Sequence, residues 1–301
     1  MAFPEASVYV GCLNLRLLNM ILSPLRFASL FTLGLLTSAS LVVGDDGTVS
    51  HTPAKPLQIA VAKPAIAPQA SSAPLKGPSL VEPQLHVARS GDPKRPRIAL
   101  TFDACMGKTD DRILSVLVSE RIPATMFVTA RWLKTNPQAL AILKQHPDLF
   151  EIENHGQNHV PAVDMPASIY GIAAAGSSDA VDQEIAGGAD AIRAAGLTQP
   201  QWFRGATAKY DISAIRQIRG MGYRIAGYSL NGDGGSLLGA AMAEKKIAAA
   251  RDGDVVIAHI NQPTHAAGEG VARAILTLKT RGVEFVRLQD VDTSGDHQST
   301  R

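Results

Sequence analysis

The chain carries six polar residues of chemically active types, each placed at or just after an apolar run. They are Asp103, His155, His159, Arg204, Asp233 and His259. Carboxylates and imidazoles transfer protons and bind metal ions, and a guanidinium holds a carboxylate in place. Their common position predicts one site built from several segments that are distant in the sequence.

His155 and His159 stand four residues apart in "HGQNH". Residues four apart face the same side of a helical turn, so two imidazoles in this arrangement can converge on a cation. Pro161 makes a longer helix unfavourable, and we therefore expect a single turn. Two polar loop histidines are the alternative, but the position of the pair after a strand favours a metal site.

Apolar runs of strand type alternate with helical patterns from Arg97 onward. The expected strands cover 97–103, 123–130, 150–154, 201–204, 223–230, 254–260 and 283–288, and the expected helices cover 110–120, 137–145, 179–195, 212–220, 238–250 and 270–280. This alternation predicts an α/β fold of about seven parallel strands joined by crossover helices, as a barrel or a doubly wound sheet. Both architectures gather side chains at the carboxyl ends of the strands.

The N-terminal part differs in composition from the rest. No acidic residue occurs between Glu5 and Asp45, and Arg16 and Arg26 precede the apolar run "FASLFTLGLLTSASLVV". This pattern predicts a signal peptide over 1–44, with an uncleaved membrane anchor as the alternative. The start at Met1 or at Met20 stays open. We expect an exported protein, periplasmic or extracellular, that meets a membrane only through this segment.

Three further segments follow. Residues 45–96 are rich in proline and alanine and predict a linker, residues 97–291 form the expected catalytic domain, and residues 292–301 are expected to be a disordered tail. Hydrophobic residues make up 46% of the chain, which is ample for a core, and the net charge is only +2. No basic run is interleaved with aromatic residues, so nucleic acid is not an expected partner.

Six motifs resemble one known family when they are taken in order. They are "IALTFDAC", "IPATMFVTARW", "FEIENHGQNH", "QWFRG", "NGDGG" and "VVIAHIN". Together they resemble the polysaccharide deacetylases, the NodB-homology domain of the fourth carbohydrate-esterase family, over about 97–290. The resemblance implies a deformed (β/α) barrel. It also implies metal-dependent removal of acetyl groups from N-acetylated glycans such as chitin or peptidoglycan, with zinc as the first candidate metal.

The resemblance also assigns roles. Asp103 matches the general base and Arg204 the residue that orients it, while His155 and His159 match the metal-binding histidines. His259 matches the general acid, with Asp233 as the partner that holds its ring.

One metal ligand of the family is missing. The second aspartate of its first motif is Ala104 here, so two histidines are left for a site that usually has three protein ligands. The candidate replacements are Asp103 itself, the Cys105 thiolate, and Asp110 or Asp111. Neighbouring side chains on a strand alternate in direction, so Asp103 and Cys105 face the same way if the extended backbone continues. Cys105 as a small residue that fills a strand-end pocket is the alternative.

The third motif departs further, since "GATAKYD" follows Arg204. We expect backbone N–H groups of residues 205–207 to stabilise an oxyanion and Tyr210 to line the sugar site. Two other functions stay open: a catalytically degenerate glycan-binding domain, which the loss at Ala104 favours, and an amidohydrolase that acts on another N-acyl compound.

Overall fold

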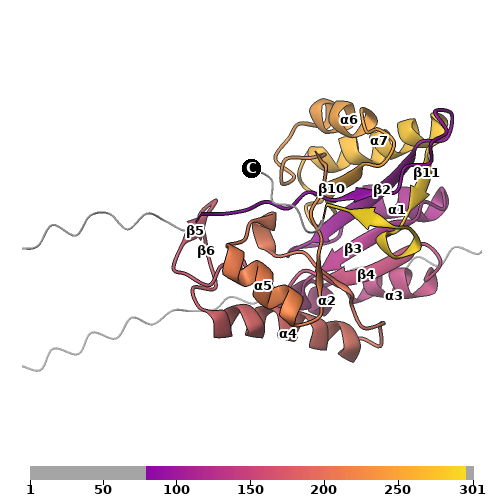
Figure 1. Cartoon of the computed structure of the whole chain (residues 1–301). Helices are drawn as coiled ribbons and strands as arrows, with labels where there is room; N and C mark the ends of the chain where they lie inside the picture. The colour runs from indigo at the N-terminus through magenta and orange to yellow at the C-terminus, as the bar shows by residue number, and fades with distance from the viewer. Residues whose placement is uncertain (1–78, 296–301) are drawn as a thin grey trace, which may run out of the picture. The chain divides into compact units, whose positions relative to one another are not determined.

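The computed structural model describes residues 79–295 (Figure 1). The predicted signal or anchor at 1–44, most of the predicted linker and the last six residues lie outside the described residues. Within 79–295, no helix has both the length and the hydropathy that a membrane span requires.

The main sheet is entirely parallel, as the alternating pattern predicts. Its strands are β2 Arg97–Ala104, β3 Ala124–Val128, β4 Phe150–Asn154, β7 Trp202–Phe203, β8 Arg224–Ile225, β9 Leu230–Asn231, β10 Val255–His259 and β11 Glu284–Val286. The strand order is β8-β7-β4-β3-β2-β10-β9, and β11 pairs with the first half of β2. Every register within this sheet is parallel, so the strands end on one common edge.

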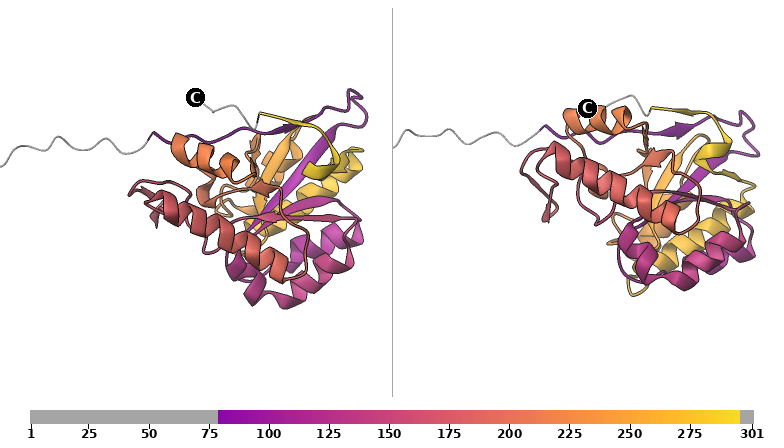
Figure 2. Two further views of the ribbon diagram at one scale, coloured as in Figure 1. Left: turned by 60° about the horizontal axis from the view of Figure 1, so that its bottom comes forward. Right: turned by 90° about the horizontal axis from the view of Figure 1, so that it is seen from below.

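Seven α-helices occur among the described residues. They are α1 Asp111–Ser119, α2 Ala130–Thr135, α3 Pro137–Gln145, α4 Ser178–Ala194, α5 Ile212–Gly220, α6 Ala240–Ala248 and α7 Ala267–Thr280. The six expected helices are present, and α2 is the addition. Oxygen-bearing side chains begin several of them: Asp110 caps α1 and Thr129 caps α2 by accepting backbone N–H bonds. Figure 1 shows α6 beside α7, and Figures 1 and 2 show α4 beside α5.

The two faces of the sheet have different roles. Along β2, the even-numbered residues Ile98, Leu100, Phe102 and Ala104 pack into the large core formed with the helices. Odd-numbered positions face the other way, where Ala99 and Phe127 belong to a separate core cluster on the inner face. The alternation of a pleated strand therefore separates structural from site-forming positions within one short segment.

The predicted strand at 223–230 is split in two. Its first part, β8, pairs with β7 at one edge of the sheet, and its second part, β9, pairs with β10 at the opposite edge. The intervening residues 226–229 connect the two edges. The prediction of one strand was wrong here because apolar content indicates extended backbone but does not specify which neighbour each half pairs with.

Residues 79–96 pack on the domain, although the sequence assigns them to the linker. β1, His86–Val87, pairs in antiparallel fashion with β12, Thr293–Ser294, and Leu85 is fully buried in the inner core cluster. The folded part therefore begins before Arg97 and continues beyond residue 291. Three buried apolar side chains, Val81, Leu85 and Val87, provide this attachment within an otherwise proline-rich segment.

A short hairpin lies in the long segment after β4. It consists of β5, Ser168–Ile169, and β6, Ile172–Ala173, joined through Tyr170 and Gly171. Both turn residues have positive φ, 53° and 80°, as a tight two-residue hairpin turn requires.

Candidate active site and metal centre

The predicted site residues meet at the carboxyl edge of the sheet. The parallel registers place His259 beside Asp103, Asp103 beside Phe127, and Phe127 beside Glu153. β4 ends just before His155. Parallel strand ends therefore bring together residues that lie more than 150 positions apart in the sequence.

Asp103 is a buried carboxylate held by a buried arginine. Arg204 Nη1 donates to Asp103 Oδ1 at 2.9 Å and to Thr101 Oγ1 at 2.9 Å, and neither charged side chain has appreciable exposure. Burial by itself would raise the pKa of Asp103, but the charges of Arg204, His155 and His259 outweigh burial and lower it. Asp103 is therefore ionised at neutral pH and oriented as a base.

Arg204 is fixed by the chain crossing at 226–229. Its Nε donates to the Ala226 carbonyl at 3.1 Å and its Nη2 donates to the Gly227 carbonyl at 3.0 Å. The guanidinium also lies over the Phe127 ring, 4.2 Å from the centroid. Because the predicted strand is interrupted at this point, these two carbonyls can accept hydrogen bonds from Arg204.

His259 and Asp233 form a second acid–base pair. Asp233 is fully buried, its two oxygens lie 3.0 Å and 3.2 Å from His259 Nδ1, and it also accepts the backbone N–H of His259 at 2.6 Å. Burial lowers the pKa of His259, but the Asp233 carboxylate outweighs burial and raises it well above the usual value. The imidazole thus carries a proton at neutral pH.

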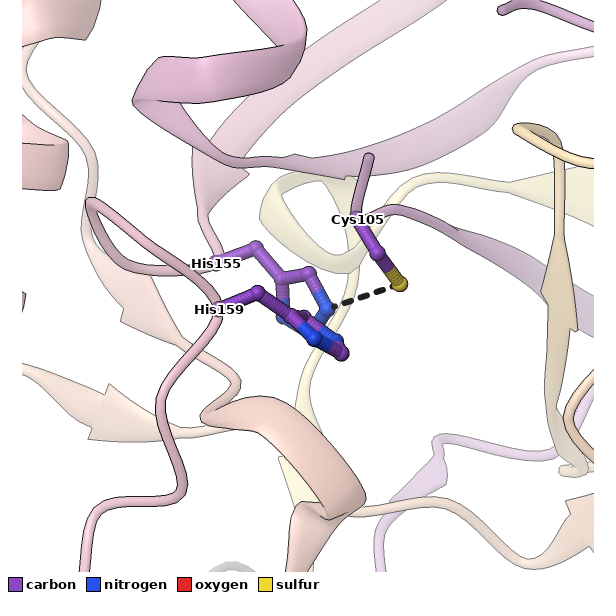
Figure 3. A group of neighbouring side chains, drawn as sticks. All are labelled: Cys105, His155 and His159. Atoms are coloured by element: carbon purple, nitrogen blue, oxygen red, sulfur yellow. Dashed lines mark hydrogen bonds between the residues drawn. The ribbon is translucent and has the colours of Figure 1, made fainter. Parts of the chain in front are cut away.

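Cys105, His155 and His159 form the candidate metal centre (Figure 3). Their ligand atoms all lie within 4.8 Å of one another, and Cys105 Sγ is 3.4 Å from His155 Nε2. One thiolate and two imidazoles are a donor set that suits zinc, with a fourth position left for water or substrate. The residues present therefore fit a divalent metal.

The tautomer of His155 supports metal binding. Its Nδ1 lies 2.5 Å from the Arg204 carbonyl oxygen. Because a carbonyl oxygen only accepts hydrogen bonds, Nδ1 carries a proton, and Nε2, which faces Cys105, is the nitrogen left to bind a metal. Metal-binding histidines usually hold their second nitrogen in this way.

The loop that presents the histidines is not a helical turn, and that expectation was wrong. His155–His159 follow β4 as an irregular bend, with Gly156 at φ 89° and His159 at φ 63°. The ring centroids of His155 and His159 are still only 5.0 Å apart. The buried Glu184 of α4 stabilises the bend, since its carboxylate accepts the backbone N–H groups of Asn158 and Val160 at 2.8–3.0 Å.

Cys105 faces the site and Ala104 does not. Cys105 directly follows β2, and its sulfur lies 3.4 Å from His155 Nε2, whereas Ala104 is buried in the outer core. Burial would raise the pKa of Cys105, but His155 and its neighbours outweigh burial and lower it well below the usual value. A thiolate is therefore the favoured form.

The other candidates for the third ligand lie elsewhere. Asp110 caps α1 and pairs with Arg112 at 2.5 Å, and Asp111 is exposed on the first turn of α1. Asp103 Oδ2 is 3.7 Å from His155 Nε2, but Arg204 already binds the other oxygen of that carboxylate. Cys105 is thus the ligand candidate that the geometry favours.

The expectations for Gly205 and Tyr210 were wrong. Tyr210 is fully buried in a core cluster, and its hydroxyl oxygen accepts the Gly205 N–H at 2.7 Å. Tyr210 therefore does not line a sugar site, and the Gly205 N–H is not free for an oxyanion.

Three supporting residues were not identified from the sequence: Thr101, Asn154 and Glu184. Asn154 Oδ1 accepts the Gly156 N–H at 2.8 Å, and its Nδ2 donates to the Ile185 carbonyl at 2.9 Å. Asn154 directly precedes His155, so its position was a usable signal. No sequence signal indicated the supporting role of Glu184, because it lies 26 residues from its partner Asn158.

Comparisons with known proteins agree with the fold. Residues 90–226 match the family model described as polysaccharide deacetylase, whereas no curated protein matches the chain. The chain resembles a family 4 carbohydrate esterase from Streptomyces lividans in complex with acetate, at 17% identity over 71% of this chain and 98% of that one, with a TM-score of 0.54. The likeness confirms the predicted α/β fold, in which the parallel sheet curls into a half-barrel. The described part of this chain has eight strands in that sheet, because one of the seven expected strands is split into β8 and β9.

Two other solved structures differ in activity. A family 4 acetyl xylan esterase from Clostridium thermocellum in complex with cobalt is 26% identical over 64% of this chain and 88% of that one, with a TM-score of 0.51. A family 4 pseudoenzyme from Bacillus anthracis is 19% identical over 66% of each chain, with a TM-score of 0.52. The same fold therefore occurs in active and inactive proteins.

Proposed function

We propose that this domain, whose residues 90–226 match the polysaccharide deacetylase model, belongs to that family and removes N-acetyl groups from an N-acetylated polysaccharide of the chitin or peptidoglycan type. One observation carries the proposal. A buried Asp103–Arg204 pair, a buried Asp233 carboxylate on His259, and the group Cys105, His155 and His159 all lie at one edge of the sheet. A domain that only binds glycan has no need of this combination.

The metal ligands in this proposal are Cys105, His155 and His159. A divalent metal held there, with zinc as the first candidate, would supply Lewis-acid polarisation of the acetamide carbonyl.

Asp103 acts as the general base. It accepts a proton from the attacking water, and Arg204 keeps it ionised and oriented through the 2.9 Å hydrogen bond. The buried environment strengthens this interaction, because few water molecules compete for either charge.

His259 acts as the general acid. Its raised pKa keeps a proton available for the departing nitrogen, and the bond from Nδ1 to Asp233 leaves Nε2 to deliver that proton. The C–N bond breaks, and acetate and a free amino sugar leave. Asp233 stabilises the imidazolium before the transfer.

Export is part of the proposal, since these polymers lie outside the cytoplasm and the N-terminal composition is of the signal type. Fractionation of cells that express the full chain tests it. Recovery in the cytoplasm alone would contradict it.

The first experiment measures metal content and acetate release together, with the full chain and two variants. We expect about one metal per wild-type chain and acetate release from N-acetylated oligosaccharides. His155→Ala should lose both properties. Asp103→Asn should keep the metal and lose activity by about 10²-fold or more, because a general base contributes about that much.

A second function has one specific observation in its favour. The aspartate expected at Ala104 is absent, and the family 4 pseudoenzyme from Bacillus anthracis shows that this fold also occurs without activity. Glycan binding without acetate release, in a metal-loaded chain, would identify this domain as a degenerate binding module. Release from simple N-acyl amides but not from glycans would identify an amidohydrolase of another class.

A further inference from the structure

The end of β2 offers two positions for a metal ligand, and they point in opposite directions. Cys105 has its sulfur 3.4 Å from His155 Nε2 on the inner face. Ala104 is 1% exposed and packs with the outer core. A small outer cavity is lined by Ala104 together with apolar side chains that include Leu114, Val128 and Trp132.

The backbone on both sides holds Cys105 in this orientation. The Thr129 hydroxyl donates to the Cys105 carbonyl, and the Thr129 N–H donates to the Ala104 carbonyl at 3.3 Å. On the β10 side, the Ile260 N–H donates to the Asp103 carbonyl at 3.1 Å. These hydrogen bonds fix the backbone of residues 103–105. A backbone rotation that turned residue 104 toward the site and residue 105 away from it would have to break them.

The donor type at residue 105 decides which metals the centre accepts. Thiolate ligands select zinc and other soft or borderline ions, whereas carboxylates suit manganese and magnesium. Cys105 is the one sulfur in a group whose other members, His155 and His159, provide imidazole nitrogens. Exchanging that one atom therefore changes the character of the whole donor set.

We propose that position 105, not position 104, carries the third metal ligand of this domain, and that its thiolate makes the centre selective for zinc-type ions. A carboxylate placed at residue 105 would give a centre that favours manganese or magnesium, whereas a carboxylate placed at residue 104 would not reach the metal. This inference rests on the proposed function and deepens it: the proposed function already places Cys105 among the ligands, and the inference adds that residue 104 cannot replace it and that the thiolate decides which metals the centre accepts.

Cobalt provides a direct probe of the sulfur ligand. The full chain, freed of metal under reducing conditions, is titrated with Co²⁺ and observed by absorption spectroscopy. We expect a thiolate-to-cobalt charge-transfer band in the wild type. Cys105→Asp should bind Co²⁺ without that band. Its preference for Zn²⁺ over Mn²⁺, measured by competition, should fall by about tenfold or more, because even the loss of a residue that hydrogen-bonds to a metal ligand lowers metal affinity by about that factor.

Ala104→Asp in a Cys105→Ser background is the matched variant. It contains the same added carboxylate one residue earlier, and we expect it to recover no metal binding. Because a buried carboxylate at residue 104 can prevent folding, Ala104→Ser in the same background is tested in parallel, with circular dichroism to establish that each variant is folded.

The outcomes separate this inference from the proposed function. A wild-type Co²⁺ complex without the sulfur band, or undiminished binding in Cys105→Ser, overturns the inference and leaves a metal-dependent hydrolase in place. Recovery of binding by a folded Ala104→Asp variant overturns it as well. Absence of any metal binding in the wild type would contradict the proposed function itself.

Discussion

In the proposed reaction, two carboxylates of the site have opposite tasks because their partners differ. Asp103 has Arg204 at 2.9 Å and is kept ionised, so that it can accept a proton. Asp233 has His259 at 3.0 Å and keeps that imidazole protonated, so that it can donate one. A base and an acid of this kind are needed together when water replaces an amine at a carbonyl carbon.

The pH dependence of catalysis should depend on Asp233. In Asp233→Asn the negative charge that raises the pKa of His259 is lost, so that pKa falls and the imidazole loses its proton at lower pH. The alkaline limb of the kcat profile for acetate release should therefore move toward acid. We expect kcat near neutral pH to fall by about 10²-fold.

His259→Gln is the control for this shift. It removes the titrating group, and its residual activity should lack the limb that moves in Asp233→Asn. An unchanged alkaline limb in Asp233→Asn would show that another group supplies the proton.

Helix α4 packs closely against the loop 155–159, which carries the two histidines of the candidate metal centre. Two consecutive glycines, Gly187 and Gly188, occur where it passes the loop. A Cβ at Gly188 would lie 2.7 Å from a backbone carbon of Gly156 and 2.2 Å from Asn154 Oδ1. The close packing allows Glu184, one turn earlier, to bind the backbone on both sides of His159.

Gly188→Ala should weaken metal binding without touching a ligand. The added methyl group collides with backbone that cannot yield easily, and the loop with His155 and His159 has to shift. We expect a loss of about 1–3 kcal/mol in the free energy of unfolding, as in other overpacked sites, and a lower Zn²⁺ affinity. Urea unfolding and Zn²⁺ titration measure the two effects.

Gly187→Ala is the matched control on the same helix. Its Cβ would meet only the side-chain end of the exposed Gln157, at 2.4 Å, and that side chain can rotate away. The gain in helix propensity of up to about 1 kcal/mol should then appear as increased stability. Equal effects of both substitutions would contradict the proposed role of close packing at Gly188.

Across the whole molecule, the interior of the half-barrel contains a second pair of acidic groups below the site. Glu151 and Glu153 both face inward from β4 and are only 4% and 3% exposed. Backbone N–H groups of Gln201 and Trp202 donate to Glu153 at 2.8 Å and 2.7 Å. Burial, with the neighbouring Glu151 carboxylate, raises the pKa of Glu153 to about 9.

This pair should make the protein less stable as the pH rises. Because the folded-state pKa lies above the unfolded value, the fold holds an extra proton. The stabilisation is complete below the unfolded pKa and is lost as the pH rises through about 9. The slope cannot exceed about 1.4 kcal/mol per pH unit for one proton.

Glu153→Gln should remove most of that slope. Its amide oxygen can still accept the two backbone N–H bonds and its NH₂ group can donate to Glu151, so the variant should be the more stable protein at pH 8–9. Urea unfolding at several pH values measures this, with Glu269→Gln on the exposed face of α7 as the control. A wild-type slope retained in Glu153→Gln would assign the proton to another group.

The sequence by itself determined the parallel α/β order, the six helices and the strand ends at which the polar residues stand. These features follow from local periodicity and from the alternation of side chains along a strand, which also predicted a shared face for Cys105 and Asp103 on the condition that the backbone stays extended. Such patterns involve residues only a few positions apart, so the chain expresses them directly.

The tertiary structure alone decided the features that depend on distant partners. The crossing at 226–229, the packing of Leu85 and the support from Glu184 all join segments whose own composition does not reveal the contact. The bend at His159 belongs to this group as well, because Glu184 compensates for a positive φ that local preference disfavours. Side-chain direction is a local property of the backbone, whereas pairing is a property of the whole fold.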